Sequence, residues 1–279
     1  MASKRKFYPL AETTMSSRRL PPEPLDHVVD LLQDTEDTLR NCSLVSKSWI
    51  PRTRKHLFAD IKFRSADDLQ SWKEMFPDPL TSPAYHAHTL TVKCIRNVTA
   101  ADAEPGGWIT GFSSVVRFRV IGQGLFTVHE RSALVPFHGF SPVMKSLHVV
   151  FTFLPSSRIL DLILSFPLLE DLTAIAHFGI STNSTVGSNA PPTIAQPSNS
   201  PAFTGSLNLS TKGGMETIVH RLLPLPGGIH FRKLTVKWLH WDDLALTMAL
   251  VERCSHTLKY IQVTCNTCGT SIRHLRPHG

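Results

Sequence analysis

Two cysteines and two histidines close to the C-terminus are of the types that bind zinc. Cys265 and Cys268 are separated by two residues, and His274 and His278 follow them. Zinc sites built from two Cys and two His need roughly twelve residues between the pairs, whereas residues 269–273 leave only five. Cys265 also falls at the end of a predicted strand. We therefore expect packing rather than a metal site here, and no cofactor.

Motifs typical of enzymes are incomplete in this chain. Gly122 and Gly124 begin a loop of the dinucleotide-binding type, but Thr127 stands where the third glycine belongs. His129 is followed by glutamate, but Ala133 occupies the position of the second histidine of a metalloprotease helix. A nucleophile elbow is also missing. We therefore expect a protein that is not an enzyme.

An aromatic and acidic cluster follows a predicted strand. It contains Trp238, His240 and Trp241, with Asp242 and Asp243 directly after them. Repeat proteins bind partners through strand faces and rims, and aromatic side chains are enriched in interfaces. The first three residues are therefore candidates for a substrate-binding surface. Burial of at least one tryptophan in the core is the alternative.

The composition is that of a globular intracellular protein. The chain has 279 residues, of which 42% are hydrophobic, five scattered cysteines and a formal net charge of +7. No apolar run approaches the ~18 residues of a membrane-spanning helix, and no apolar stretch follows Lys4-Arg5-Lys6 as in a secretory signal. We expect a soluble protein of the cytoplasm, the nucleus or both. The basic excess permits acidic partners but does not predict binding of nucleic acid or membrane.

The N-terminal residues predict a tail and a first helix. Residues 1–19 are polar and basic and are expected to be disordered. Proline is tolerated only in the first turn of a helix, so Leu20-Pro21-Pro22-Glu23-Pro24 marks the helix start. The apolar stripe of this helix, at i, i+3, i+4 and i+7, is Leu25, Val28, Val29 and Leu32.

A second helix is expected to present one continuous apolar face, made of Leu39, Cys42, Val45, Ser46 and Trp49. Pro51 ends this helix or starts another, and a basic segment then leads to an alternating strand at Ile61 and Phe63. Three short helices in about 45 residues make a core too small to be stable alone, so the rest of the chain or a partner should cover it. The basic residues could meet an acidic partner or form a solvated face: Lys47, Arg52, Arg54, Lys55, Lys62 and Arg64.

Short strand-like stretches recur beyond residue 64. Their equivalent positions are Leu90, Phe118, Leu147, Leu172, Leu207, Leu234 and Ile261. Successive positions are 25 to 29 residues apart, except for one interval of 35, in and around the range of leucine-rich repeats. Helical patterns fall within 65–76, 159–166, 218–223 and 244–251. We predict an α/β protein in which residues 64–279 form an irregular, leucine-rich-like solenoid with a parallel sheet and helices on one face.

The long interval contains residues 181–206, which are almost all Ser, Thr, Asn, Pro and Ala. This composition predicts a flexible insertion; a phosphorylated or binding loop is the alternative. No polar capping repeat follows the strand at 260–263, although solenoid ends normally need one. We therefore expect an exposed or poorly ordered C-terminal edge, and a truncated gene product or shortened paralogue.

Two motifs of the N-terminal helices carry a family resemblance when they are taken together. They are Leu20-Pro21-x-Glu23-x-Leu25-x-x-Val28-x-x-x-Leu32 and Cys42-Ser43-Leu44-Val45-Ser46-Lys47-Ser48-Trp49. At this spacing residues 20–63 resemble an F-box, and more narrowly the F-box-like proteins of mushroom-forming fungi. Gly228–Thr235 and Cys254–Leu258 resemble the same proteins.

That resemblance implies a substrate-recognition adaptor of an SCF-type ubiquitin ligase, in which the F-box docks on the Skp subunit and the solenoid binds a target protein. The implied Skp contacts are Leu20, Pro21, Leu25, Val28, Leu44, Val45 and Trp49. Pro24 departs from the aliphatic residue usual at its position. The alternative is a non-ligase scaffold in which these helices only cap the solenoid.

Overall fold

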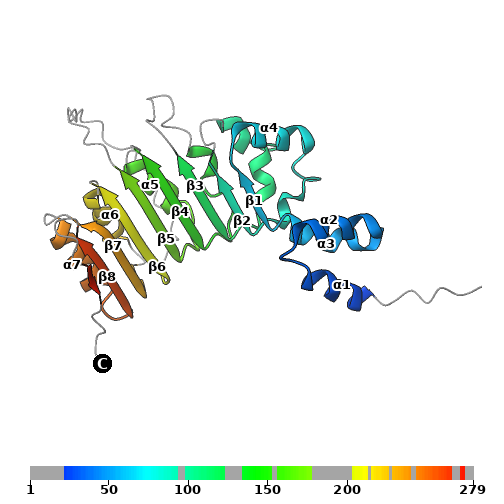
Figure 1. Ribbon diagram of the computed structural model, residues 1–279. Helices are drawn as coiled ribbons and strands as arrows, with labels where there is room; N and C mark the ends of the chain where they lie inside the picture. The colour runs from blue at the N-terminus through cyan, green and yellow to red at the C-terminus, as the bar shows by residue number, and fades with distance from the viewer. Residues whose placement is uncertain are drawn as a thin grey trace, which may run out of the picture. The chain divides into compact units, whose positions relative to one another are not determined.

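The protein divides into two compact units between Thr53 and Arg54 (Figure 1). The predicted division falls after residue 63, whereas the strand Asp60–Phe63 pairs within the sheet of the second unit and belongs to it. None of the described helices is long and apolar enough to cross a membrane. The structure, a computed structural model, describes residues 22–93, 98–122, 134–152, 156–177, 203–212, 215–225, 228–239, 243–265 and 271–273.

The first unit contains two helices and the start of a third. α1 (Pro22–Leu31) begins within the proline run, and α2 (Glu36–Val45) follows it. A 3-10 turn, η1 (Lys47–Trp49), leads into α3 (Ile50–Leu57), which continues into the second unit. Pro51 lies in the first turn of α3, where its missing N–H removes no helical hydrogen bond. Pro51 was predicted either to end the second helix or to start another, and the structure places it at the start of α3.

The predicted continuous face from Leu39 to Trp49 is interrupted at Ser46. Ser46 is extended, with φ −149° and ψ 137°, and its hydroxyl accepts a hydrogen bond from the backbone N–H of Ser48. Leu39 is buried, but Val45 is exposed because α2 ends there. The prediction of one continuous apolar face is therefore wrong from Val45 onward.

All eight predicted strands form one parallel sheet in the second unit, and they follow one another across the sheet in chain order. A short antiparallel strand, β9 (Ser271–Arg273), pairs with residues 262–264 of β8. β8 is therefore paired on both sides over these residues, and β9 forms the C-terminal edge that was expected to be exposed or poorly ordered. The parallel strands are β1 (Asp60–Phe63), β2 (Thr89–Val92), β3 (Arg117–Gly122), β4 (Ser146–Thr152), β5 (Asp171–His177), β6 (Ser206–Lys212), β7 (Lys233–Leu239) and β8 (Tyr260–Cys265).

The predicted equivalent positions lie in register as one row across the sheet, which begins at Ile61 and continues through Leu90, Phe118, Leu147, Leu172, Leu207, Leu234 and Ile261. All are buried except Ile261, which is partly buried. A second inward row, two residues further on, runs from Phe63 to Val263. A slip of one residue would turn both rows to the outer face, so burial specifies this register.

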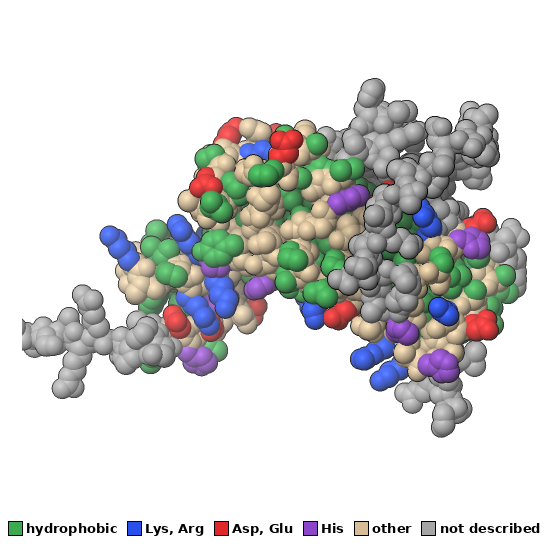
Figure 2. All heavy atoms as spheres, turned by 180° about the vertical axis from the view of Figure 1, so that it is seen from behind, with side chains coloured by type: hydrophobic (Ala, Val, Ile, Leu, Met, Phe, Trp, Pro, Cys, Tyr) green, Lys and Arg blue, Asp and Glu red, His purple; other side chains and the backbone are tan. Residues whose placement is uncertain are grey.

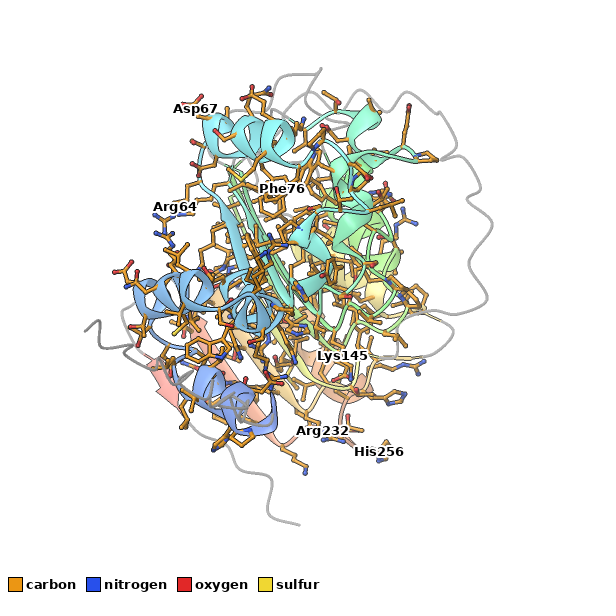
Figure 3. All side chains as sticks on the ribbon, turned by 90° about the vertical axis from the view of Figure 1, so that its right-hand side faces the viewer. Arg64, Asp67, Phe76, Lys145, Arg232 and His256 are labelled. Atoms are coloured by element: carbon orange, nitrogen blue, oxygen red, sulfur yellow. The ribbon has the colours of Figure 1, made fainter. Side chains whose placement is uncertain are left out.

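Helices cover one face of the sheet, as predicted (Figures 1 and 3). They are α4 (Ala66–Met75), α5 (Ser156–Leu164), α6 (Met215–Leu222) and α7 (Leu244–Arg253). α4 starts with a capping box. The Ser65 hydroxyl accepts a hydrogen bond from the N–H of Asp68, and the Asp68 carboxylate accepts one from the N–H of Ser65.

Aromatic side chains fill the core between α4 and the first strands. Trp108 and Phe112 of η5 (Trp108–Phe112) have ring centroids 5.3 and 6.3 Å from that of Phe63. Trp72 of α4 lies 5.6 Å from the same ring. Three further 3-10 helices are described at this end: η2 (Pro83–His86) between α4 and β2, η4 (Ala100–Ala103) after β2, and η7 (Val135–Phe137) after β3.

The predicted insertion, 181–206, lies outside the described residues up to position 202. Its last residues differ from the prediction. Phe203 is fully buried, with its ring centroid 5.3 Å from that of Phe231, and Ser206 begins β6. Residues 203–206 therefore belong to the folded sheet, because Phe203 contributes to its core.

Candidate partner-docking surface

Four large apolar side chains of the first unit are exposed to solvent. Val28 and Leu31 of α1 are 46% and 72% exposed. Leu44 and Val45 of α2 are 84% and 72% exposed. We call these four residues the apolar surface set. Each pair lies within one turn of its helix, and an exposed apolar patch is typical of a site that another surface covers.

Local structure explains why these side chains face outward. Val28 and Leu31 are three residues apart and therefore neighbours on the surface of α1, whereas Val29 is fully buried. Leu44 and Val45 occupy the last turn of α2, where the extended Ser46 ends the helix. In the described part of the unit, the buried residues are no more numerous than the apolar surface set. They are Val29, Leu39, Cys42 and Thr53.

An ion pair joins α1 to α3 within the first unit. Nε of the Arg52 guanidinium donates to Oδ1 of Asp30 at 2.6 Å, and Nη2 donates to Oδ2 of the same carboxylate. The hydrogen bonds that Arg52 donates to the Asp30 carboxylate raise the pKa of Arg52 above its usual value. Planar two-point pairing of this kind fixes orientation as well as contact. The pair therefore holds in place the helix that carries Val28 and Leu31.

The structure exposes three of the predicted docking residues, Val28, Leu44 and Val45, and leaves Trp49 half-buried. Leu31 was not predicted, because it lies off the i, i+3, i+4, i+7 stripe that begins at Leu25. Its spacing of three from Val28 is the signal that could have found it. The remaining predicted docking residues lie outside the described residues: Leu20, Pro21 and the side chain of Leu25.

The other predicted sites fall largely outside the described residues. Trp238 lies in β7, but its side chain is not among them, and neither are His240 and Trp241. Of the cysteines and histidines considered for zinc, only the backbone of Cys265 is described, at the end of β8 as predicted. Across the described ranges, no three His, Cys, Asp or Glu side chains are grouped so that they could hold a metal ion.

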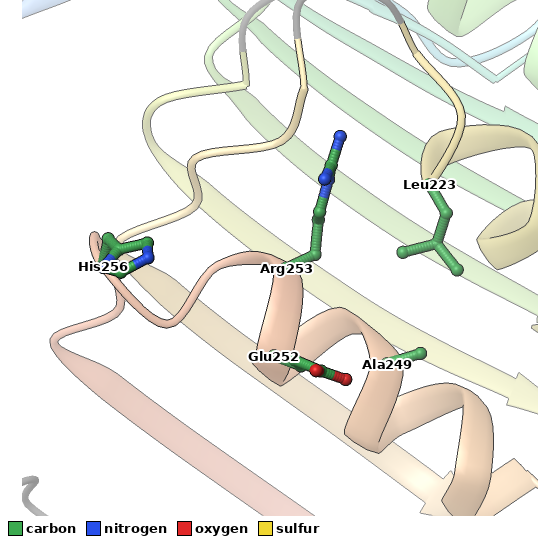
Figure 4. A pocket seen from close by; sticks show the side chains of 5 residues that line it. All are labelled: Leu223, Ala249, Glu252, Arg253 and His256. Atoms are coloured by element: carbon green, nitrogen blue, oxygen red, sulfur yellow. The ribbon is translucent and has the colours of Figure 1, made fainter.

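A hollow of about 500 Å³ lies beside α7 (Figure 4). It is lined by Leu223, Ala249, Glu252, Arg253 and His256. Figure 4 shows that Glu252, Arg253 and His256 point in different directions rather than toward one shared point. Catalysis or tight binding of a small molecule needs convergent polar groups, so we assign no site to this hollow.

Among protein-family models, curated proteins and solved structures, none matches this chain. Function is therefore inferred from the exposed residues and their chemistry.

Proposed function

We propose that this protein is a substrate-recognition adaptor of a cullin-based ubiquitin ligase. Its first unit is an F-box-like domain that docks on the Skp subunit, and its second unit is a leucine-rich-like solenoid that binds a target protein. The protein acts in the cytoplasm, the nucleus or both and has no catalytic role of its own. The ubiquitin chemistry belongs to other subunits of the ligase.

The exposure of the apolar surface set carries this proposal. Three of its members, Val28, Leu44 and Val45, are residues that the resemblance to F-box proteins assigns to the Skp interface. Burying a Val or Leu side chain contributes about 1.5–3 kcal/mol. Each of these side chains can therefore contribute an apolar contact to an interface, and their burial would also add to the small core of the unit.

The second unit supports the target-binding half of the proposal. Its parallel strands follow one another in chain order at a nearly constant spacing, and helices lie on one face. In solenoids, each repeat contacts only its neighbours, and the strand face forms an extended binding surface. A sheet of this kind can recognise a protein without any active-site constellation.

The docking claim is tested by calorimetric titration of a purified fungal Skp subunit into the full-length protein and into Leu44→Asp. Leu44 is 84% exposed in the free protein. Losing its burial removes about 2 kcal/mol, or about 30-fold in Kd, and the new charge adds to the loss. Leu80→Asp is the matched control, because Leu80 is 88% exposed and belongs to the second unit. This control is expected to bind Skp like the wild type.

Two results contradict docking: no binding of the wild type at about 10 μM, or equal Skp affinity of Leu44→Asp and the wild type. The scaffold alternative makes a different prediction. If the helices only cap the solenoid, the wild type fails to bind Skp, and Leu44→Asp lowers the thermal unfolding temperature of the second unit while Leu80→Asp does not.

A further inference from the structure

Cationic side chains gather on the outer face of the sheet at its β1–β3 end. Side chains alternate along a strand, so the residues between the two inward rows point away from the core. Figure 3 shows Arg64 extending outward from the end of β1. Five exposed residues of this face form what we call the basic sheet surface: Lys62, Arg64, Lys93, Arg117 and Arg119.

Lys62 lies in β1 with Arg64 directly after it, Lys93 directly follows β2, and Arg117 and Arg119 lie in β3. Thr91 of β2 lies between Lys62 of β1 and Arg119 of β3, and Thr89 lies between Asp60 of β1 and Arg117 of β3. Neighbouring strands are ~4.8 Å apart, so β1 and β3 are separated by about 10 Å, and Arg117 and Arg119 lie about 7 Å apart along β3. Thr89 is half-buried and Thr91 is buried, so the long side chains on either side, not the threonines, form the accessible surface.

Two acidic side chains, Asp60 and Asp68, lie beside this surface, both at its β1 side. Asp60 pairs with Lys62. The Asp68 carboxylate accepts hydrogen bonds from two backbone N–H groups at the start of α4. Within the part of the chain that the structure describes, neither Arg117 nor Arg119 has an ion-pair partner. Both guanidinium groups therefore remain available to an anion from outside.

We infer that the basic sheet surface binds an extended, acidic segment of a protein partner, laid along β2. Side chains on one side of an extended chain are about 7 Å apart, which matches the spacing of Arg117 and Arg119. Acidic residues at every second position can therefore face both arginines at once. Guanidinium groups bind carboxylates through two parallel hydrogen bonds.

A protein segment fits this surface better than single-stranded nucleic acid does. Proteins that bind single strands stack bases on aromatic side chains, and the outer positions of β1, β2 and β3 hold none. The opposite, helical side of the unit displays acidic, basic and histidine side chains interspersed (Figure 2). The inference concerns the target side of the proposed adaptor and does not depend on Skp docking, because these residues all belong to the second unit.

The test uses the full-length protein and a fluorescein-labelled ten-residue peptide in which Glu and Ser alternate, followed by fluorescence anisotropy. A peptide with Gln in place of Glu is the uncharged control. We expect Arg119→Glu to weaken binding of the Glu peptide by about 10-fold or more. Lys237→Glu is the matched control, because Lys237 is exposed in β7 on the same sheet and the change in net charge is identical. It should change the Kd by less than about 2-fold.

Three outcomes overturn the inference. The Gln peptide binds as tightly as the Glu peptide, the two variants weaken binding equally, or a ten-nucleotide single-stranded DNA binds more tightly than the Glu peptide. The third outcome would make this a nucleic-acid surface. If circular dichroism shows that Arg119→Glu is unfolded, Arg119→Gln replaces it, and unchanged affinity of that variant overturns the inference. Skp titrations are unaffected by any of these results.

Discussion

Removing a side chain from the middle of the inward row tests the register of the sheet. Leu147 is 1% exposed and lies between Phe118 and Leu172 in neighbouring strands. Leu147→Ala removes three carbon atoms, worth about 2.4 kcal/mol at ~0.8 kcal/mol each. The cavity that remains raises the expected loss to about 3–4 kcal/mol. For a unit of this size, that lowers the midpoint of thermal unfolding by about 10 °C.

Leu168→Ala is the control for this prediction, because the same substitution is made at a side chain that is 52% exposed. It should change the stability by less than about 0.5 kcal/mol. Thermal unfolding of both variants is followed by circular dichroism, and urea unfolding gives the free energies. Equal losses in the two variants, or a loss under about 1 kcal/mol for Leu147→Ala, would refute the inward placement of this row.

Three further predictions concern charge and capping. Burial lowers the pKa of both His86 and His148, and nearby cations add to the shift, Lys55 and Arg54 for His86 and Arg119 for His148. The unfolded chain therefore binds protons first, and stability should fall as pH drops from about 7 to about 5. His148→Gln should reduce this dependence, which urea titrations at each pH would measure. Ser65→Ala removes one half of the capping box of α4 and should lower the free energy of unfolding by about 1 kcal/mol. An unchanged free energy of unfolding in urea titrations would contradict the capping box. Asp30→Asn removes the acid that pairs with Arg52, so α1 should show faster hydrogen exchange while the sheet does not. Unchanged exchange in α1 would contradict the role of this ion pair in holding α1 in place.

The strands and their register were predictable because burial alternates with a period of two. Leu90, Phe118 and their equivalents each begin a short apolar alternation, and each mismatch in register would expose several large side chains. The capping box at Ser65 was predictable for a local reason, since both of its hydrogen bonds join residues three positions apart.

Other features depend on contacts that a sequence pattern does not encode. The exposure of Val45 depends on where α2 ends, and Ser46 decides this through a hydrogen bond with Ser48. The 3-10 helix at Trp108–Phe112 is too short for a helical period to be visible, and its position follows from aromatic packing on Phe63. Phe203 stands at the end of a Ser- and Pro-rich stretch, so composition hid a core residue.

That cationic side chains of separate strands share one face of the sheet could not be seen from the sequence either. Lys62 and Arg64 were visible as part of a basic run, but Arg117 and Arg119 lie more than fifty residues later. Only the parallel register of β1, β2 and β3 brings the two pairs onto one face. Long-range β pairing of this kind cannot be derived from local spacing alone.

Hydrogen–deuterium exchange of the full-length protein, with and without a saturating fungal Skp subunit, tests the central claim most directly. The claim predicts slower exchange in α1 and α2, including the turns that carry Val28, Leu31, Leu44 and Val45, and little change across β4–β7. A complex that leaves exchange in α1 and α2 unchanged, or the absence of any complex, would contradict the assignment of this protein as a Skp-docking adaptor.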